Sequence, residues 1–348
     1  MPQLNIDSPH RWPSEWETQA ATWIAWPHNR QTWPGRFDSI PECFFQLAKL
    51  ISETQPVYVL ASAEMLPTHH LSELSQRSNI RIVNIPTNDA WIRDYGPTFV
   101  QRKDDRSLVG VCWKFNSWGN RYTPYDLDAE AAVRICQSLR CQRSMSALHC
   151  EGGALDCNGQ DTLISSSNCL LNPNRNPGWS RQMVEEELKM QLGARKVLWI
   201  DGGGLEGDDT DGHIDQLARF VNRTAIIAAI SSSPEDPNKA ALAANVRALQ
   251  GTATAEGEAI KVYTLPTPPP RFVGSSRVPE SYCNFLVTNS TVIVPTFRSE
   301  RTDGAAIELL ADLFPTRRIA PLDAYELSWG LGAFHCASQH QPESSTNP

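Results

Sequence analysis

The amino-acid sequence predicts an α/β protein in which roughly five ββαβ-like units follow one another along the chain. Short apolar runs rich in β-branched residues alternate with helical segments, which begin near Ser39, Asp126, Ser180, Asp236 and Asp303. The units, of roughly 55 to 65 residues each, share a pattern but negligible sequence identity. Such repetition favours a radial arrangement that protects the sheet edges and leaves a central mouth. An ordinary two-domain α/β sheet protein is the alternative.

The predicted strands are short runs of Val, Ile, Leu and aromatic residues bounded by turn residues. They are TWIAW from Thr22, VYVLAS from Val57, IRIVNIP from Ile80, LVGVCWKF from Leu108, TLISSS from Thr162, KVLWID from Lys196, AIIAAI from Ala225, IKVYTLP from Ile260 and TVIVPTF from Thr291. A partner strand precedes two of these runs, ARFVN before AIIAAI and FLVTN before TVIVP. In both places a helical segment and a further strand follow, which gives the ββαβ order.

The predicted helices share helical spacing of their apolar residues. They cover 39–54, 126–141, 180–193, 236–251 and 303–314, with a short additional helix near Leu71. Ser or Asp at several starts is the expected N-cap, and Gly193 and Gly251 end the third and fourth helices. The proline-dense stretch 266–271 is interpreted as a surface loop, because candidate functional residues lie on both sides of it. We therefore expect one domain over 1–348, with a disordered tail in the last few residues.

Composition and charge exclude several classes of protein. No apolar stretch approaches the roughly 18 to 20 residues of a membrane span, so we expect no membrane partner. The 31 basic residues against 39 acidic ones give a net charge of −8, which argues against nucleic acid and favours a cationic or neutral ligand. No secretory signal is visible at the start, and nine cysteines, an odd number, predict thiols rather than a disulfide framework. A cytoplasmic protein is expected.

The segment NDAWIRDYGPTF, residues 88–99, is the first candidate functional segment. It places Asp89, Trp91, Arg93 and Asp94 beside a Gly-Pro stop, at the predicted end of a strand. Two carboxylates and a tryptophan can hold a flat cation, because the acids pair with its N–H groups and the ring stacks on its face. The alternative is an aspartate that caps a turn and pairs with the arginine.

The segment CEGGALDCNG, residues 150–159, is the second candidate. Two glycines follow Glu151, and glycines allow the backbone to approach a ligand or another strand closely. A plain turn is the alternative interpretation.

The third candidate is DGGGLEGDDTDGHIDQLARF, residues 201–220, a loop rich in glycines and acids. We expect it to enter a strand that carries His213 and Asp215, whose H-x-D spacing would direct both side chains to one face. A calcium loop made of the aspartates of the DDTD run is one alternative, although their spacing departs from the EF-hand pattern. A transition-metal site using His213 and Asp215 is another, and it lacks an evident third ligand.

The fourth candidate is SWGLGAFHCASQHQP, residues 328–342, in which Cys336 follows a glycine-rich approach. His335 is adjacent, but neighbouring residues of an extended chain point to opposite faces, which makes His335 a poor general base for Cys336. We expect His213 to transfer the proton instead. A buried structural cysteine is the alternative.

Together these segments resemble the agmatine deiminase and bacterial peptidylarginine deiminase-type family, a family of guanidino-group-modifying enzymes. The matching stretches occur in order over nearly the whole chain, and they are ATWIAWPHNRQTW, WIRDYGPTF, EGGALD, DDTDGHIDQLARF, SYCNFLVTNSTVIVPTF and HCASQHQP. The resemblance implies a five-bladed, pseudo-symmetric α/β propeller of ββαβ units, the pentein fold. It also implies hydrolysis of a guanidine C–N bond, no metal, no organic cofactor, and a homodimer.

The resemblance further implies a catalytic set. Cys336 matches the nucleophile, His213 the general acid/base, and Glu151 the acid that orients the histidine. Asp94 and Asp215 match the carboxylates that clamp the guanidinium group. In the implied mechanism the thiolate attacks the guanidino carbon, the histidine protonates the departing nitrogen, ammonia leaves, and water then hydrolyses the thiouronium intermediate to a ureido product.

The resemblance leaves the substrate open among several guanidines. Agmatine, which would give N-carbamoylputrescine, is the first choice, and Trp91 and Asp209 are expected to contribute to binding it. Free arginine or a terminal peptidyl arginine is the close alternative. The distal amine of agmatine needs an acidic partner, such as the DDTD run supplies, whereas a distal carboxylate needs Arg or Lys.

Two further alternatives belong to other classes of protein. A metal-dependent hydrolase would use His213, Asp215 and Cys336 as metal ligands. A non-catalytic propeller would bind a cationic guanidine and release no ammonia.

Overall fold

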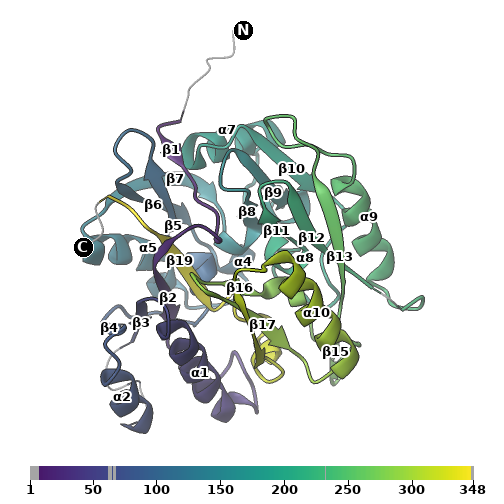
Figure 1. Cartoon of the computed structure of the whole chain (residues 1–348). Helices are drawn as coiled ribbons and strands as arrows, with labels where there is room; N and C mark the ends of the chain where they lie inside the picture. Colours follow the sequence, from purple (N-terminus) through teal and green to yellow (C-terminus); the bar gives the residue numbers. More distant parts are fainter. Residues whose placement is uncertain (1–7, 62–64, 66–67, 232, 346–348) are drawn as a thin grey trace.

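The computed structural model describes residues 8–61, 65, 68–231 and 233–345, and it shows a mixed α/β fold (Figure 1). In this described part of the chain, the strands form five sheets of three or four strands and one two-stranded hairpin. Each of the five sheets contains two adjacent antiparallel strands. The chain then passes through a helix into a third strand, which pairs parallel with the second strand. The predicted ββαβ order is therefore present in all five sheets.

Four of these units are continuous in sequence. Their elements are β5 (Thr98–Arg102), β6 (Leu108–Lys114), α5 (Asp126–Leu139) and β7 (Gln142–His149); β8 (Leu155–Cys157), β9 (Thr162–Ser166), α7 (Arg181–Leu192) and β10 (Lys196–Ile200); β11 (Ala218–Asn222), β12 (Ala225–Ile230), α9 (Lys239–Leu249) and β13 (Lys261–Pro266); β16 (Leu286–Val287), β17 (Thr291–Thr296), α10 (Glu300–Leu313) and β18 (Arg318–Asp323).

The fifth unit joins the two ends of the chain. Its elements are β19 (Ser338–Pro342), β2 (Gln19–Ala25), α1 (Ile40–Ser52), β3 (Val57–Leu60), α2 (Thr68–Ser75) and β4 (Ile80–Val83). The C-terminal strand β19 pairs antiparallel with β2, with Ser338 opposite Ile24 and Gln341 opposite Ala21. This pairing fixes the segment just before β19, which carries Cys336, against the N-terminal part of the chain.

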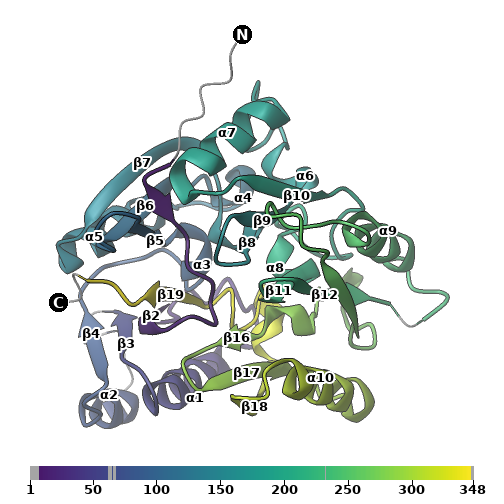
Figure 2. The ribbon, with the colours of Figure 1, turned by 45° about the horizontal axis from the view of Figure 1, so that its top comes forward.

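The remaining elements are short. They are β1 (His10–Arg11), the hairpin of β14 (Phe272–Val273) and β15 (Ser276–Arg277), α3 (Ile92–Tyr95), α4 (Ser117–Asn120), α6 (Ser167–Leu170), α8 (Ile214–Leu217), and 3-10 turns at Phe37–Ser39, Gly152–Ala154, Tyr282–Asn284 and Leu327–Gly330. Figure 2 shows α1, α5, α7, α9 and α10 on the outside of the sheets. In the same view the sheets surround the region in which α3 and α8 lie.

Polar composition hid three strands from the sequence analysis. The strand β7 reads QRSMSALH and has several exposed residues, and β8 is only three residues long. The strand β19 reads SQHQP, yet all five residues are buried. Strand prediction relies on apolar alternation over several residues; β7 and β19 are too polar to show it clearly, and β8 is too short. Of the predicted C-terminal tail, residues 346–348 lie outside the described residues, whereas the Ser345 N–H donates to the Arg106 carbonyl at 3.1 Å.

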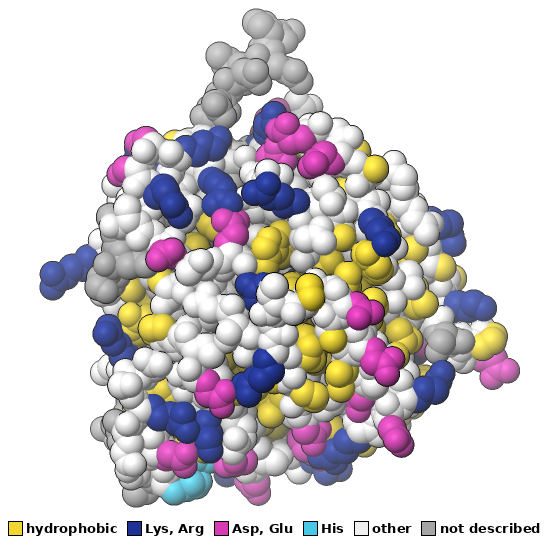
Figure 3. Space-filling model, viewed as in Figure 1, with side chains coloured by type: hydrophobic (Ala, Val, Ile, Leu, Met, Phe, Trp, Pro, Cys, Tyr) yellow, Lys and Arg dark blue, Asp and Glu magenta, His cyan; other side chains and the backbone are white. Residues whose placement is uncertain are grey.

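The surface mixes charges of both signs. On the face drawn in Figure 3, Lys and Arg side chains are scattered among Asp and Glu side chains and apolar groups. None of the helices in the described ranges is long and apolar enough to cross a bilayer.

The end of α7 provides a test of the packing. Ser180 Oγ accepts the Met183 N–H at 3.2 Å at its start, and Gly193 ends it with a φ of +77°. A Cβ on Gly193 would overlap the His10 carbonyl oxygen, whereas Gly178, at φ +82°, has no neighbour within 4 Å. We expect Gly193→Ala to lower the free energy of unfolding by at least about 2 kcal/mol and Gly178→Ala by about 1 kcal/mol.

Urea unfolding of both variants followed by circular dichroism measures this difference. Equal losses of stability in the two variants would show that the close contact between the end of α7 and β1 does not contribute to the free energy of unfolding.

Candidate active site

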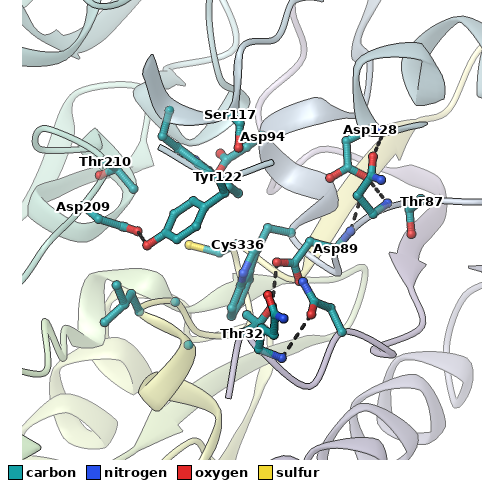
Figure 4. A pocket seen from close by; sticks show the side chains of 18 of the residues that line it. Thr32, Thr87, Asp89, Asp94, Ser117, Tyr122, Asp128, Asp209, Thr210 and Cys336 are labelled. Atoms are coloured by element: carbon teal, nitrogen blue, oxygen red, sulfur yellow. Dashed lines mark hydrogen bonds between the residues drawn. The ribbon is translucent and has the colours of Figure 1, made fainter. Parts of the chain in front are cut away.

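A cavity of about 600 Å³ is lined by residues from distant parts of the chain (Figure 4). Four residues predicted from the sequence line it, namely Trp91, Asp94, Asp209 and Cys336. The other three, Glu151, His213 and Asp215, are buried directly behind Asp94 and Cys336. The fold therefore brings all seven predicted residues to one place.

Asp94 lies in the short helix α3 and not at the end of a strand, as the sequence analysis expected. The helical turn is stopped by the Gly96-Pro97 pair, so the backbone turns sharply before β5 begins. Asp94 Oδ1 accepts the Gly153 N–H at 3.0 Å, and its Oδ2 accepts the Trp118 Nε1–H at 3.0 Å. Burial, and the neighbouring acids Asp215 and Glu151, raise the pKa of Asp94 to about 6, despite the opposing effect of His213.

The expected strand through His213 and Asp215 is also wrong, because Ile214–Leu217 form the helix α8 with His213 at its N-cap. Thr210 Oγ1 accepts the His213 N–H at 3.0 Å, and this turn directs the chain into α8. The H-x-D spacing still places both side chains beside Asp94, at the start of a helix rather than along a strand. Sequence periodicity cannot identify so short a helix.

The imidazole of His213 lies between two carboxylates. Its Nδ1 is 3.6 Å from Asp94 Oδ1, and its Nε2 is 3.6 Å from Glu151 Oε2. Burial by itself lowers the pKa of His213, but Asp94, Cys169 and Glu151 together raise this pKa well above its ordinary value. The imidazolium form is therefore favoured in the resting site.

The two glycines after Glu151 make room for this arrangement. A Cβ on Gly153 would lie 2.6 Å from His213 Nδ1, 2.7 Å from Asp94 Oδ1 and 3.1 Å from Asp215 Oδ2. A Cβ on Gly152 would overlap the Arg93 carbonyl oxygen. The close-approach interpretation of the EGG motif is confirmed.

Glu151 is held by residues that the sequence analysis did not single out. Arg175 Nε donates to Glu151 Oε1 at 3.1 Å, and the Cys169 thiol donates to Oε2 at 3.8 Å. Burial would raise the pKa of Glu151, but His213 and Arg175 hold it at about 2. The carboxylate therefore remains charged beside His213. Arg175 follows the helix α6 in NPNRNP, a segment with no apolar pattern and no recognised motif.

Cys336 lies in a turn and not in the extended chain that the sequence analysis assumed. Its Sγ is 3.5 Å from Asp215 Oδ2 and 3.1 Å from Asn284 Nδ2. Burial, Asp215 and Asp94 raise the pKa of Cys336 well above that of an ordinary thiol, against the hydrogen bond from Asn284. The thiol form is therefore favoured in the resting site.

Cys336 lines the cavity and His335 does not, yet both side chains reach Asp215 from this turn. His335 Nδ1 lies 2.7 Å from Asp215 Oδ2, the same oxygen that the Cys336 thiol approaches. The other ring nitrogen of His335 lies 2.7 Å from Glu15 Oε1. Because carboxylates occupy both nitrogens, His335 supports Asp215 and leaves no nitrogen free to act on Cys336.

Further acidic residues line the cavity. Asp209 Oδ2 accepts the Tyr122 hydroxyl at 2.5 Å, and Asp89 Oδ2 accepts the Thr32 hydroxyl at 2.7 Å. Asp128 lines the cavity as well, and Figure 4 shows Asp209 on the opposite side of the view from Asp89 and Asp128. Burial raises the pKa of Asp89 to about 6 and that of Asp128 to about 8. No lysine or arginine of the described chain is among the lining residues.

The other aspartates of the DDTD run, Asp208 and Asp211, bind groups of the protein itself. Asp208 accepts N–H groups of Thr210 and Gly212 at 3.1 and 2.6 Å. Asp211 pairs with Arg121 at 2.7 Å and also with Arg175. These contacts occupy the oxygens on which the calcium-loop alternative depended.

A set of side chains within the site could also hold a metal ion. The ligand atoms of Glu151, Cys169 and His213 lie within 4.8 Å of one another, and all three residues are buried. This set differs from the His213, Asp215 and Cys336 set considered from the sequence. The guanidinium group of Arg175 already contacts Glu151, and its positive charge opposes a second cation at this position.

Asn284 holds the cysteine turn in place and is the basis of a test. Its Oδ1 accepts the N–H groups of Ala333, His335 and Cys336 at 3.1–3.2 Å, while its Nδ2 donates to Sγ. Asn284→Asp keeps the acceptor but replaces the donor with a negative charge. We expect the alkylation rate of Cys336 by iodoacetamide to fall at least about tenfold, because the thiolate loses a donor and meets a like charge.

Peptide mass spectrometry after timed alkylation measures this rate, and circular dichroism confirms that the variant is folded. An unchanged alkylation rate in a folded variant would show that Asn284 does not control the reactivity of Cys336.

The whole chain is similar to proteins of known family. A sequence profile of the Porphyromonas-type peptidyl-arginine deiminase family matches residues 11–342. The agmatine deiminase of Pseudomonas syringae pv. tomato (strain ATCC BAA-871 / DC3000) is 34% identical over 353 residues, which cover 95% of each chain.

Two solved structures are also similar to the chain. One is the agmatine deiminase of Enterococcus faecalis, which shares 29% identity with a TM-score of 0.88 over 96% of each chain. The other is a Cys-to-Ser variant of the C. jejuni agmatine deiminase with substrate bound, which shares 26% identity with a TM-score of 0.87 over 96% of this chain and 97% of that one. The protein belongs to the Porphyromonas-type peptidyl-arginine deiminase family, and it is a deiminase, a hydrolase that acts on C–N bonds.

Proposed function

We propose that the protein hydrolyses agmatine to N-carbamoylputrescine and ammonia. The charge of the cavity is the observation that carries this choice of substrate. Asp89, Asp94, Asp128 and Asp209 line it, and no lysine or arginine of the described chain does. Agmatine is positive at both ends, with a guanidinium group at one and an ammonium group at the other. Such a dication meets carboxylates at each end of the cavity.

The guanidinium group is proposed to lie against Cys336, between Asp94 and Asp215. A guanidinium ion is planar, permanently charged and rich in N–H donors, so carboxylates in its plane and an aromatic ring on its face recognise it. Asp94 and Trp91 line the cavity, and Asp215 is 3.5 Å from the thiol. The ammonium end then lies near Asp89, which lines the cavity.

The proposed reaction begins with loss of the Cys336 thiol proton to solvent, because His213 is already an imidazolium ion in the resting site. Burial and two neighbouring acids disfavour the thiolate in the free enzyme, and a bound guanidinium cation offsets their negative charge. The thiolate therefore forms mainly when substrate is bound. It attacks the guanidino carbon and gives a tetrahedral adduct that is neutral overall. Asp94 and Asp215 hold its N–H groups and stabilise the positive charge that returns when the departing nitrogen is protonated.

His213 is proposed to serve both halves of the reaction. As an imidazolium ion it protonates the departing nitrogen, the C–N bond breaks, and ammonia leaves. The neutral imidazole then takes a proton from water, which attacks the thiouronium carbon and breaks the C–S bond. The ureido product and the Cys336 thiolate result. Glu151, 3.6 Å from Nε2, holds the imidazole and stabilises its charged form.

Deimination of arginine or of a terminal peptidyl arginine is the second candidate, and the name of the family favours it. These substrates carry a carboxylate or a peptide group where agmatine carries an ammonium group. A carboxylate near Asp89 would meet a like charge above about pH 6, where Asp89 is ionised, and no arginine or lysine of the described chain lines the cavity to offset it. The acidic lining therefore favours agmatine.

We also infer that the five sheets are the blades of a five-bladed propeller. The same ββαβ order recurs in every sheet, and the pairing of β19 with β2 joins the last unit to the first. The nine cysteines, all of them free thiols, support action in the reducing cytoplasm.

Ammonia release from agmatine, arginine and short arginyl peptides tests the proposed function. We expect kcat/KM for agmatine to exceed that for arginine at least about 100-fold, which corresponds to about 2.7 kcal/mol. Cys336→Ala should abolish turnover, with a loss of at least about 10⁴-fold in kcat.

The Cys336→Ala protein should still bind agmatine by calorimetry, which separates loss of chemistry from loss of the site. Absence of turnover of every guanidine by the unmodified protein would refute the function, and a preference for arginine would refute the choice of substrate.

The acidity of the cavity predicts a pH dependence. Asp89 and Asp94 each have a pKa of about 6, so their negative charges are lost as the pH falls through that value. We expect kcat/KM for agmatine to fall about tenfold per pH unit or more below pH 6, because the carboxyl groups no longer attract the cation. Steady-state rates between about pH 5 and pH 8 measure the profile.

Asp89→Asn provides the control for this profile. It should raise KM with a smaller change in kcat and make the acidic limb less steep, because one titrating group is removed. A flat profile in the unmodified protein would contradict the assignment of these carboxylates to substrate binding.

A further inference from the structure

Three cysteines that the proposed reaction does not use lie together beneath the helix α5. They are Cys112, Cys136 and Cys141, all present as free thiols. None of them lines the active-site cavity. Cys112 and Cys136 are buried in a small apolar cluster, against which Cys141 packs from a partly exposed position.

The packing of α5 on β6 brings two of the thiols together. Gly110 and Cys112 are two residues apart on β6, so they share one face of the strand. Gly110 has no side chain, and a Cβ there would overlap Cys136 Sγ. The helix therefore seats Cys136 directly on the strand, beside Cys112, whose thiol donates to the Gly110 carbonyl at 3.8 Å. Figures 1 and 2 show α5 beside β6 and β7.

The end of α5 brings the third thiol to the same place. Arg140 ends the helix in the left-handed conformation, with a φ of 53°, and the Cys141 N–H donates to the Cys136 carbonyl at 3.1 Å. This six-to-one hydrogen bond is the signature of the Schellman motif, in which the side chains of these two positions contact each other. Cys136 is thus the shared neighbour of Cys112 and Cys141.

The chemical environments of these thiols differ. A hydrogen bond with Cys136 lowers the pKa of Cys141, and the charge of Arg143 contributes to the same shift. Cys136 is buried and its pKa is raised. An accessible thiol with thiolate character beside a buried protonated thiol is the arrangement of an attacking and a resolving cysteine. The catalytic candidate Cys336 differs, because burial and acids raise its pKa well above the ordinary value.

We propose that Cys141 and Cys136 form a redox-active dithiol that hydroperoxides oxidise to a disulfide, with Cys112 placed to exchange with Cys136. The Cys141 thiolate attacks one peroxide oxygen, the O–O bond breaks, and a sulfenic acid and one water form. The Cys136 thiol then attacks the sulfenic sulfur, the S–O bond breaks, and the S–S bond forms with release of a second water. The two thiols lose two electrons in total, and one hydrogen peroxide accepts them.

Peptide mapping of the full chain tests this proposal without reference to the proposed reaction. The protein is treated with increasing hydrogen peroxide, denatured, alkylated at its remaining thiols and digested. We expect a peptide pair linked through Cys136 and Cys141 to appear at peroxide concentrations at which Cys336 is still a reduced thiol. Cys336 is then recovered in its alkylated form. Oxidation of Cys336 before Cys141, or of Cys141 to sulfinic acid with Cys136 still free, would overturn the proposal.

Two serine variants provide matched controls. Cys141→Ser should slow the loss of the free Cys136 thiol at least about tenfold, because the attacking thiolate is removed. Cys43→Ser should leave the link unchanged, since Cys43 is also partly exposed but has its pKa raised to about 12 by burial and by Asp323 and Glu42. If the Cys136 thiol is lost as fast in the Cys141→Ser protein as in the unmodified protein, Cys141 is not the attacking thiol. Loss of the Cys136–Cys141 link in the Cys43→Ser protein would show that the oxidation is not specific to this pair.

Discussion

The burial of several carboxylates around one thiol is the constraint on which the rest of this structure depends. Asp94, Glu151, Asp215 and Glu15 are all nearly inaccessible to solvent. Like charges in a low-dielectric interior repel strongly, so each carboxylate needs a positive partner at short range. The positive partners are His213 between Asp94 and Glu151, Arg175 on Glu151, and Arg93 and Arg219 on Glu15. His335 contacts both Asp215 and Glu15, but burial, Arg219 and Arg93 lower its pKa, so its contribution is hydrogen bonding rather than charge.

This arrangement explains the chemistry proposed for the site. The arginines and His335 hold the acids behind the cavity, while Asp94 and Asp215 face the reacting centre with part of their negative charge uncompensated. Asp215 Oδ1 has no hydrogen-bond partner among the described residues. A guanidinium ion supplies the missing donors and charge. The same excess of negative charge favours the protonated form of Cys336. In the proposed mechanism a bound cation offsets that charge, so formation of the nucleophile is coupled to binding of the substrate.

The topology explains how residues so distant in sequence meet. Each of the contributing segments precedes or follows a strand of a different sheet, and the short helices α3 and α8 deliver Asp94 and Asp215 to the same point. Gly153 removes the side chain that would otherwise fill it. The pairing of β19 with β2 then fixes the Cys336 turn against the N-terminal segment that carries Glu15.

The sequence by itself determined the ββαβ order and the family, and it predicted seven candidate site residues that the fold brings together, because these follow from local patterns and from motifs within single segments. It did not reveal Glu15, Arg175, Asn284 or the role of His335, because these residues act through contacts between segments far apart in the chain. It also assigned extended backbone to His213 and Cys336, since a single helical turn has too few residues to show periodicity. Which acids are charged, and which thiols are protonated, was decided only by the tertiary structure, because burial and the partners it brings set those pKa values.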